Sequence, residues 1–126
     1  MINLLFVDDE ADLDLIYKWE FDKWVKEEKC SYTFKNSAVD ALEYVRKTNV
    51  EDLLILTDIT MDEMDGLELL TIVKNEFPKI KVIILSGNLP GVYKEKSLSL
   101  GADAYYEKPV DFEEIKMYLM EEFDIK

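Results

Sequence analysis

The chain has 126 residues, of which 48% are hydrophobic and 34% charged, and its formal net charge is −13 at pH 7. This length and apolar content are typical of one folded domain, expected to span residues 1–126, and they exclude intrinsic disorder. So large a negative charge repels nucleic-acid phosphates and anionic lipids, which excludes a nucleic-acid-binding or membrane-surface role for this chain alone.

The first stretch of the chain is a short apolar run, and similar runs recur at intervals. Those predicted as strands are residues 2–7, 32–34, 53–56, 82–85 and 104–106. Most of them are continuously apolar, which is typical of strands that are covered on both faces, as in a parallel sheet.

Each of these runs is followed by a stretch with helical character. The residues expected to face the core are Leu13, Ile16, Tyr17, Phe21 and Trp24, then Ala38, Ala41, Leu42 and Val45, then Leu67, Leu70, Val73 and Phe77, and finally Phe112, Ile115, Leu119 and Phe123. Ser37 and Asp111 are the expected N-caps, and the polar stretch 92–100 is the expected fourth helix. The alternation predicts a doubly wound α/β domain with a five-stranded parallel sheet.

The residue types that are absent or rare exclude several kinds of catalytic and metal-binding site. Histidine is absent and Cys30 is the only cysteine, which excludes Ser-His-Asp catalysis, intrachain disulfides and zinc sites made of histidines or thiolates. The N-terminus lacks the basic region of a signal peptide, and no apolar run is long enough to cross a bilayer. We therefore expect a cytoplasmic protein that uses carboxylates, hydroxyls, lysines and hard metal ions.

Polar residues stand where the predicted strands end. Asp8 and Asp9 follow the first strand, Asp58 the third, Ser86 the fourth and Lys108 the fifth. Because parallel sheets bind ligands beyond the carboxyl ends of their strands, these side chains are expected to converge there. A plainer alternative is that the acids are solvated turn residues, and that Asp9 merely favours the start of the first helix.

Such a cluster has a definite chemistry. Two carboxylates about 4 Å apart repel each other by about 4 kcal/mol at an effective dielectric constant of about 20, so one of them protonates or a cation binds. With oxygen ligands alone, that cation is expected to be Mg²⁺ or Mn²⁺. A metal ion, a lysine and a hydroxyl around one carboxylate are the equipment for phosphoryl transfer, with Asp58 as the nucleophile and Asp8 and Asp9 holding the metal.

At these positions the sequence resembles the receiver domain of two-component response regulators. The matching segments are FVDDE at residues 6–10, TDITMDEMDG at 57–66, ILSG at 84–87, GADAYYEKP at 101–109 and DFEEI at 111–115. The resemblance covers essentially the whole chain and implies a flavodoxin-like receiver fold. One departure is Asp62, which stands where the family has proline and adds an acid beside the site.

The resemblance implies a role for each site residue. Asp58 matches the phosphoacceptor, Asp9 the direct Mg²⁺ ligand, Asp8 the acid that acts on the metal through water, and the Thr60 carbonyl the backbone ligand. Lys108 matches the lysine that pairs with the phosphoryl group.

A second group of residues is implied in switching and in the lifetime of the product. Ser86 matches the switch hydroxyl, which bonds a phosphoryl oxygen, and Tyr105 the switch aromatic. Thr60 and Asn88 flank the site and are expected to influence dephosphorylation.

The function that the resemblance implies is a phosphoacceptor, which catalyses only its own phosphorylation and dephosphorylation. Its phosphoryl donor would be a histidine kinase or a histidine phosphotransfer protein. The fourth helix, fifth strand and fifth helix would contact a downstream target or a fused output domain. Two alternatives stay open, namely a receiver-like binding module that is not phosphorylated and an aspartyl-phosphate phosphohydrolase. The second lacks part of its usual motif, because Thr60 stands where haloacid-dehalogenase-like enzymes have a second acid.

Overall fold

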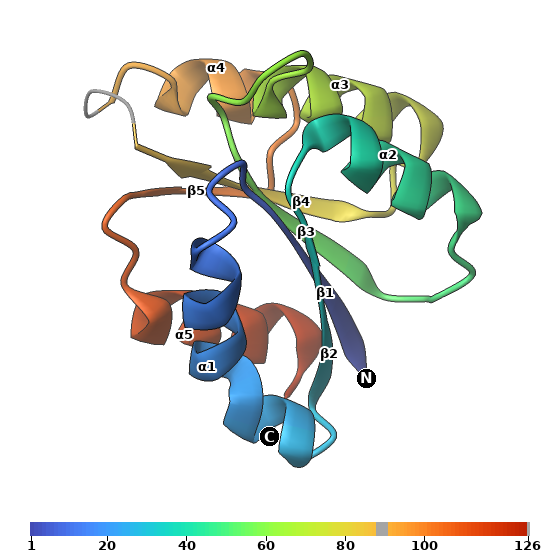
Figure 1. Ribbon diagram of the computed structural model, residues 1–126, viewed down its shortest axis with the longest axis vertical. Coiled ribbons are helices and arrows are strands. Elements are labelled where there is room, and N and C mark those ends of the chain that lie inside the picture. The colour runs from blue at the N-terminus through green and yellow to red at the C-terminus, as the bar shows by residue number, and fades with distance from the viewer. Residues whose placement is uncertain (88–90, 126) are drawn as a thin grey trace.

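The computed structural model describes residues 1–87 and 91–125, along which strands and helices alternate. The elements are β1 (Ile2–Val7), α1 (Leu13–Lys26), β2 (Cys30–Lys35), α2 (Ala38–Lys47), β3 (Leu53–Asp58), α3 (Gly66–Glu76), β4 (Lys81–Ser86), α4 (Lys94–Ser99), β5 (Ala104–Glu107) and α5 (Phe112–Phe123). All strand pairs are parallel, and the five-stranded sheet has the order β2-β1-β3-β4-β5 (Figure 1). The predicted α/β architecture is confirmed, with β3 as the central strand.

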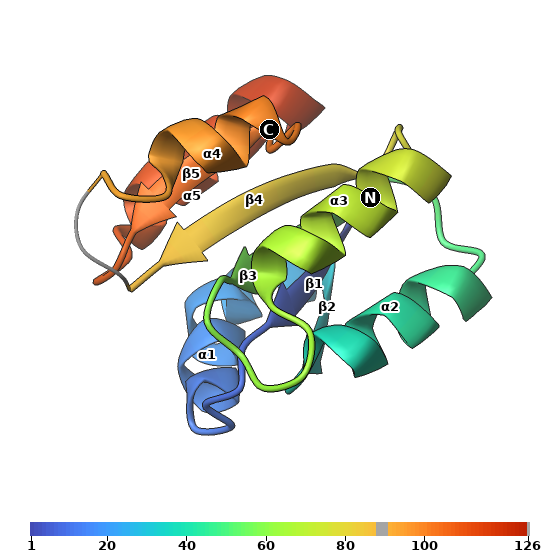
Figure 2. The same cartoon turned by 90° about the horizontal axis from the view of Figure 1, so that it is seen from above.

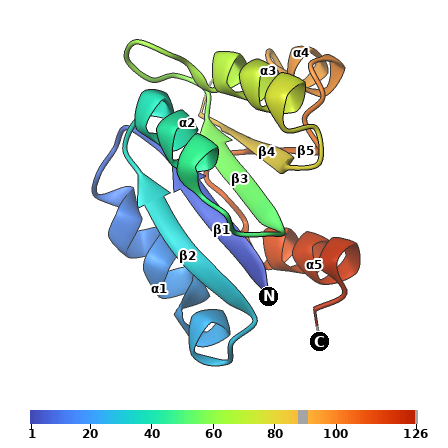
Figure 3. The ribbon, with the colours of Figure 1, turned by 90° about the vertical axis from the view of Figure 1, so that its right-hand side faces the viewer.

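Two apolar cores lie on opposite faces of this sheet. The helices α1 and α5 cover one face, and α2, α3 and α4 cover the other (Figures 2 and 3). Because successive residues of a strand point to opposite faces, Leu54 and Leu56 pack with α1 and α5, whereas Leu53 and Ile55 pack with α2 and α3. This double coverage explains why β3 is buried along its whole length and begins with four consecutive apolar residues.

The strands extend further than their apolar runs. β2 covers Cys30–Lys35 rather than residues 32–34, since pairing with β1 uses backbone groups and does not require apolar side chains. β3 includes Asp58, which pairs with Leu85, and β4 includes Ser86, which pairs with Glu107. These polar residues are therefore held in the sheet itself rather than in the loops that follow it.

The helices agree with the predicted pattern, with a few exceptions. Ser37 and Asp111 cap α2 and α5 through their side chains, as predicted. Ile16 was predicted to face the core but is 49% exposed, because the buried side of α1 is formed by Tyr17 and its neighbours further along the helix. The fourth helix is shorter than predicted and covers Lys94–Ser99.

None of the helices formed by the described residues combines the length and the apolar character that crossing a bilayer requires.

Candidate functional site

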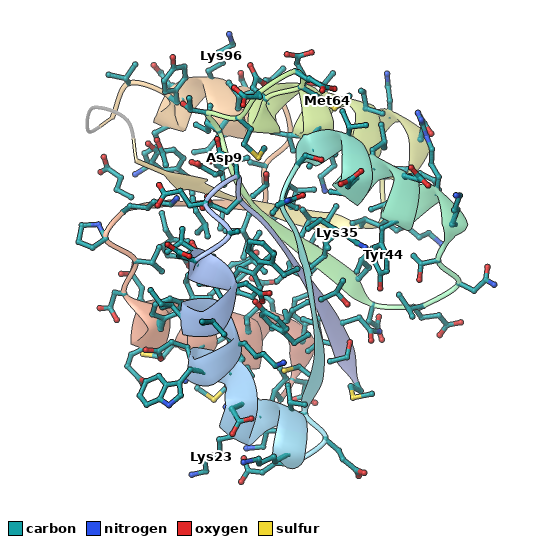
Figure 4. The ribbon with its side chains drawn as sticks, viewed as in Figure 1. Asp9, Lys23, Lys35, Tyr44, Met64 and Lys96 are labelled. Atoms are coloured by element: carbon teal, nitrogen blue, oxygen red, sulfur yellow. The ribbon has the colours of Figure 1, made fainter. Side chains whose placement is uncertain are left out.

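Acidic side chains and a lysine meet at the carboxyl edge of the sheet. Asp8, Asp9 and Asp58 each offer a carboxylate oxygen, and these oxygens lie within 4.8 Å of one another. Asp9 marks this edge in Figure 4, in the loop that follows β1. The Nζ of Lys108 lies 2.7 Å from Asp8 Oδ2 and 3.6 Å from Asp58 Oδ2. Strand ends that are far apart in the sequence thus place these four side chains together.

A pocket of about 420 Å³ opens at this edge. Its walls carry mainly charged or polar groups, from Asp9, Glu10, Asp58, Thr60, Gly87 and Lys108. Thr60, whose carbonyl the resemblance implies as a metal ligand, is thus part of the wall of this pocket. Asn88, which was expected to flank the site, lies outside the described residues.

Asp8 is almost completely buried, with 1% of its surface exposed. Its Oδ1 accepts a hydrogen bond from the Glu10 backbone N–H at 3.0 Å, and its Oδ2 accepts one from Lys108 at 2.7 Å. A carboxylate in such surroundings needs donors for its charge. The part played by the Glu10 N–H was not predicted, because a backbone donor leaves no signal in the sequence.

Lys108 is bound more closely to Asp8 than to Asp58. Burial alone lowers the pKa of Lys108, but the hydrogen bond to Asp8 and the nearby charge of Asp58 outweigh burial and raise the pKa overall. Lys108 therefore stays charged at neutral pH. Its peptide bond to Pro109 is cis, and its backbone N–H donates to the Ser86 carbonyl at 2.8 Å.

Asp58 carries a charge that its surroundings disfavour. It is 8% exposed, and its Oδ1 accepts a hydrogen bond from the Ile59 N–H at 2.8 Å. Burial, with smaller contributions from Asp8 and Asp9, raises the pKa of Asp58 to about 6, although Lys108 and the Ile59 N–H act in the opposite direction. A bound cation would relieve this unfavourable charge.

A glycine at the start of α3 lies against the backbone of Asp58. A Cβ atom added to Gly66 would lie 1.9 Å from the Asp58 carbonyl oxygen. The Gly66 N–H donates to the Ile59 carbonyl at 2.8 Å, and Asp65 and Glu68 form a capping box that fixes the first turn of the helix. Only glycine allows α3 to begin this close to Asp58. Gly66 was not predicted as a site residue, although its position directly after Asp65 was a possible signal.

The two proposed switch residues lie on neighbouring strands. Ser86 is fully buried at the end of β4, and Tyr105 lies on β5 and packs against the core formed with α2 and α3. The Tyr105 hydroxyl is buried, and the described part of the chain offers it no hydrogen-bond partner. Asp62 is exposed and is not a member of the acidic cluster.

The donor set of this cluster fits a hard divalent cation. Asp8, Asp9 and Asp58 present carboxylate oxygens, which suit Mg²⁺ or Mn²⁺ rather than metals that prefer nitrogen or sulfur. A cation and Lys108 would together offset the negative charge that these acids share.

Sequence comparisons point to one family. The family model described as response regulator receiver domain matches residues 4–120. The chain is 32% identical over 120 residues to the transcriptional regulatory protein ZraR of Klebsiella oxytoca. The aligned region covers 95% of this chain and 26% of that protein. It is 37% identical over 91 residues to the two-component response regulator ARR10 of Arabidopsis thaliana. Here the aligned region covers 71% of this chain and 16% of that protein. The chain thus spans only a small part of the length of these relatives.

Solved structures have the same architecture. A CheY-like response regulator receiver domain protein from Methanospirillum hungatei has a TM-score of 0.83 and 27% identity, with 98% of this chain and 94% of that chain covered. The response regulator TrrA from Thermotoga maritima, in complex with Mg²⁺-BeF, has a TM-score of 0.79 and 26% identity, with 96% of this chain and 98% of that chain covered.

Proposed function

The chain belongs to the response regulator receiver domain family of two-component systems, with its flavodoxin-like fold, and on this premise we propose that Asp58 accepts a phosphoryl group. The observation that carries the proposal is the surroundings of Asp58, which ends the central strand beside Asp8, Asp9 and the Lys108 ammonium. The donor would be a phosphohistidine of a sensor histidine kinase or a histidine phosphotransfer protein.

Each residue of the site would have a separate role in phosphoryl transfer. Asp9, Asp58 and the Thr60 carbonyl would hold Mg²⁺ directly and Asp8 through water, and the ion would supply charge neutralisation for the transferred group. An Asp58 carboxylate oxygen forms the new bond to phosphorus, while the bond between phosphorus and the donor imidazole nitrogen breaks and its electron pair stays with the imidazole. Lys108 turns from Asp8 to an oxygen of the phosphoryl group.

The phosphorylated form would differ from the free form at neighbouring strands. The new oxygens on Asp58 offer acceptors to the Ser86 hydroxyl, and Tyr105 would follow the resulting movement. The buried Tyr105 hydroxyl has no hydrogen-bond partner among residues 1–87 and 91–125, which supports this assignment, since the side chain gains by moving to where its hydroxyl is satisfied. The surface of α4, β5 and α5 would then contact a downstream target or a fused output domain.

Acetyl phosphate with Mg²⁺ tests the proposal directly. Intact mass spectrometry is expected to show one added phosphoryl group, labile to base and to hydroxylamine and absent when the metal is chelated. Asp58→Asn should abolish the adduct. Asp62→Asn is the matched control, because it removes an exposed acid on the following loop and should keep the adduct.

Two outcomes would count against the proposal. An adduct that persists in Asp58→Asn would place the acceptor elsewhere, and a wild-type chain that gains no mass would favour a binding module that is not phosphorylated. Steady release of phosphate from a generic phosphoester would favour a phosphohydrolase.

A further inference from the structure

A third acidic residue follows the two aspartates in the loop after β1. Glu10 is exposed and lines the pocket at the carboxyl edge of the sheet, together with Asp9 and Lys108. It is not a member of the acidic cluster, whose carboxylate oxygens lie within 4.8 Å of one another. Glu10 therefore adds negative charge to the wall of the pocket and has no role in the site as described so far.

The backbone of Glu10 is fixed on both sides. Its N–H donates to Asp8 Oδ1 at 3.0 Å, and its carbonyl accepts from the N–H of Leu13, the first residue of α1, at 3.0 Å. These bonds use main-chain atoms, so they do not depend on the side chain at position 10. A substitution of Glu10 can thus remove the charge from the pocket wall without removing the N–H that Asp8 accepts.

No positive charge is paired with the Glu10 carboxylate. Lys108 forms ion pairs with Asp8 and Asp58, and among residues 1–87 and 91–125 no ion pair includes Glu10. Burial lowers the pKa of Lys108, whereas the surrounding carboxylates, Glu10 among them, raise it overall. Lys108 and one divalent cation would match the charge of the three carboxylates of the acidic cluster. The charge of Glu10 would then remain unbalanced.

This remaining charge acts on a phosphoryl donor. Glu10 and Asp58 line the same pocket, so a donor that brings phosphorus to Asp58 comes under the electrostatic influence of Glu10. Like charges repel each other, and the repulsion grows with the charge of the donor. Acetyl phosphate is a dianion near neutral pH, whereas phosphoramidate has a protonated nitrogen and carries one negative charge less. A phosphohistidine with a protonated imidazole has the same advantage.

We propose that Glu10 is a specificity-determining residue, whose charge disfavours acyl phosphates relative to donors with a protonated leaving nitrogen. The inference rests on the proposed function, because it concerns the transfer of a phosphoryl group to Asp58. In both reactions an Asp58 oxygen bonds to phosphorus. With phosphoramidate the bond from phosphorus to nitrogen breaks, and ammonia leaves with its electron pair. With acetyl phosphate the bond from phosphorus to the bridging oxygen breaks, and acetate leaves with that pair.

The rates with the two donors test this role. Each rate is measured by intact mass spectrometry at saturating Mg²⁺ and low ionic strength, with the donor dilute enough for the rate to be proportional to its concentration. Glu10→Gln should raise the rate about fivefold with acetyl phosphate and about twofold with phosphoramidate, so the ratio of the two rates shifts toward acetyl phosphate. The shift should shrink at about 0.5 M salt, because salt screens exposed charges.

Two further variants serve as controls. Glu51→Gln makes the same chemical change, but Glu51 is exposed and precedes β3 at the opposite end of the sheet, so the ratio should stay that of wild type. Glu10→Asp keeps the charge and should keep the wild-type ratio as well. A change in metal affinity or in folding alters both rates alike and leaves their ratio unchanged.

Several outcomes would overturn the inference. These are an unchanged ratio in Glu10→Gln, an equal shift in Glu51→Gln, a shift in Glu10→Asp as large as in Glu10→Gln, and a shift that persists at high salt. Adducts that form with an unchanged ratio contradict the inference about Glu10 alone. A wild-type chain that gains no phosphoryl group from either donor contradicts the proposed function, and the inference with it.

Discussion

The two ends of the β-sheet both carry a hollow, and the larger hollow is the one without the acidic cluster. At the carboxyl end the pocket has a volume of about 420 Å³ and is lined mainly by charged and polar residues. At the amino end a hollow of about 690 Å³ has a largely apolar wall, which includes Val45, Val50, Leu53, Phe77, Pro78, Ile80 and Phe123. The larger hollow is therefore not the one that contains the acidic cluster, where phosphorylation is proposed.

The charges at the two ends are balanced differently. Near the amino end, Lys74 lies 2.8 Å from Asp103 and donates to the Ile80 carbonyl at 2.8 Å, while Asp103 also accepts from the Val82 N–H at 2.8 Å. These groups satisfy one another. At the carboxyl end the acidic cluster faces Lys108, and Asp58 is left with a raised pKa. The charged groups near the amino end are thus paired with one another, whereas Asp58 at the carboxyl end has a negative charge that a bound cation would stabilise.

The largest effect on stability is expected from a substitution at Gly66, because the start of α3 packs tightly against the Asp58 backbone at the carboxyl end. Gly66→Ala places a Cβ 1.9 Å from the Asp58 carbonyl oxygen, so the helix or the strand must move. We expect the free energy of unfolding in urea to fall by about 3 kcal/mol. The control is Gly87→Ala, whose Cβ would lie at an ordinary 3.6 Å from Lys108 Cδ and which should keep its stability. Equal stability of the two variants would show that the contact at Gly66 is not tight.

The next effect concerns the unfavourable charge on Asp58. Its pKa of about 6 in the fold exceeds the ordinary 3.8, so the folded state binds the proton more tightly than the unfolded state does. Wild-type stability therefore falls as the pH rises through this interval, by roughly 2 to 3 kcal/mol in total. Asp58→Asn lacks this loss and should be more stable than wild type near neutral pH without metal, by a margin that shrinks at low pH.

Urea unfolding at about pH 4 and at about pH 7.5, with the metal chelated, measures this margin. Asp62→Asn, which changes an exposed acid, should show no such dependence on pH. A margin of the same size at both pH values would mean that Asp58 does not titrate as the structure indicates.

A smaller loss is expected at the amino end. Phe77 is half-buried at the end of α3 and packs against the core on that face of the sheet. Phe77→Ala should lower the free energy of unfolding by about 2 kcal/mol, and Phe77→Leu by less. The rate of phosphorylation of the folded protein should not change in either variant. A fall in that rate would show that the amino end of the sheet also affects phosphorylation.

The smallest effect is expected from the ion pair near the amino end. Lys74→Met removes the ammonium but leaves the Val82 N–H to hold Asp103, so stability should fall by about 1 kcal/mol. Lys79→Met is the control, because Lys79 is exposed. A gain in stability on replacing Lys74 would show that this pair does not stabilise the fold.

Much of the architecture could be predicted from local sequence patterns. The apolar runs indicated a parallel sheet because strands that are covered on both faces exclude polar side chains, and the runs stop where the chain leaves the core. This is why Asp8, Asp58, Ser86 and Lys108 could be placed at strand ends. Their roles in phosphorylation remain predictions.

Helix faces were less certain than strand ends. Ile16 and Tyr17 are adjacent and both fit an apolar stripe, yet Tyr17 is buried and Ile16 is half exposed. Which of the two faces the sheet depends on how α1 is rotated about its axis, and helical periodicity leaves that rotation free by one residue.

The sequence by itself determined the order of the elements and the residue types that arrive at the carboxyl edge of the sheet, because burial acts on each strand separately. Only the tertiary structure decided that Lys108 binds Asp8 more closely than Asp58 and that Gly66 lies against the Asp58 backbone. These contacts depend on strand order and on helix docking, which are set by packing between segments far apart in the chain.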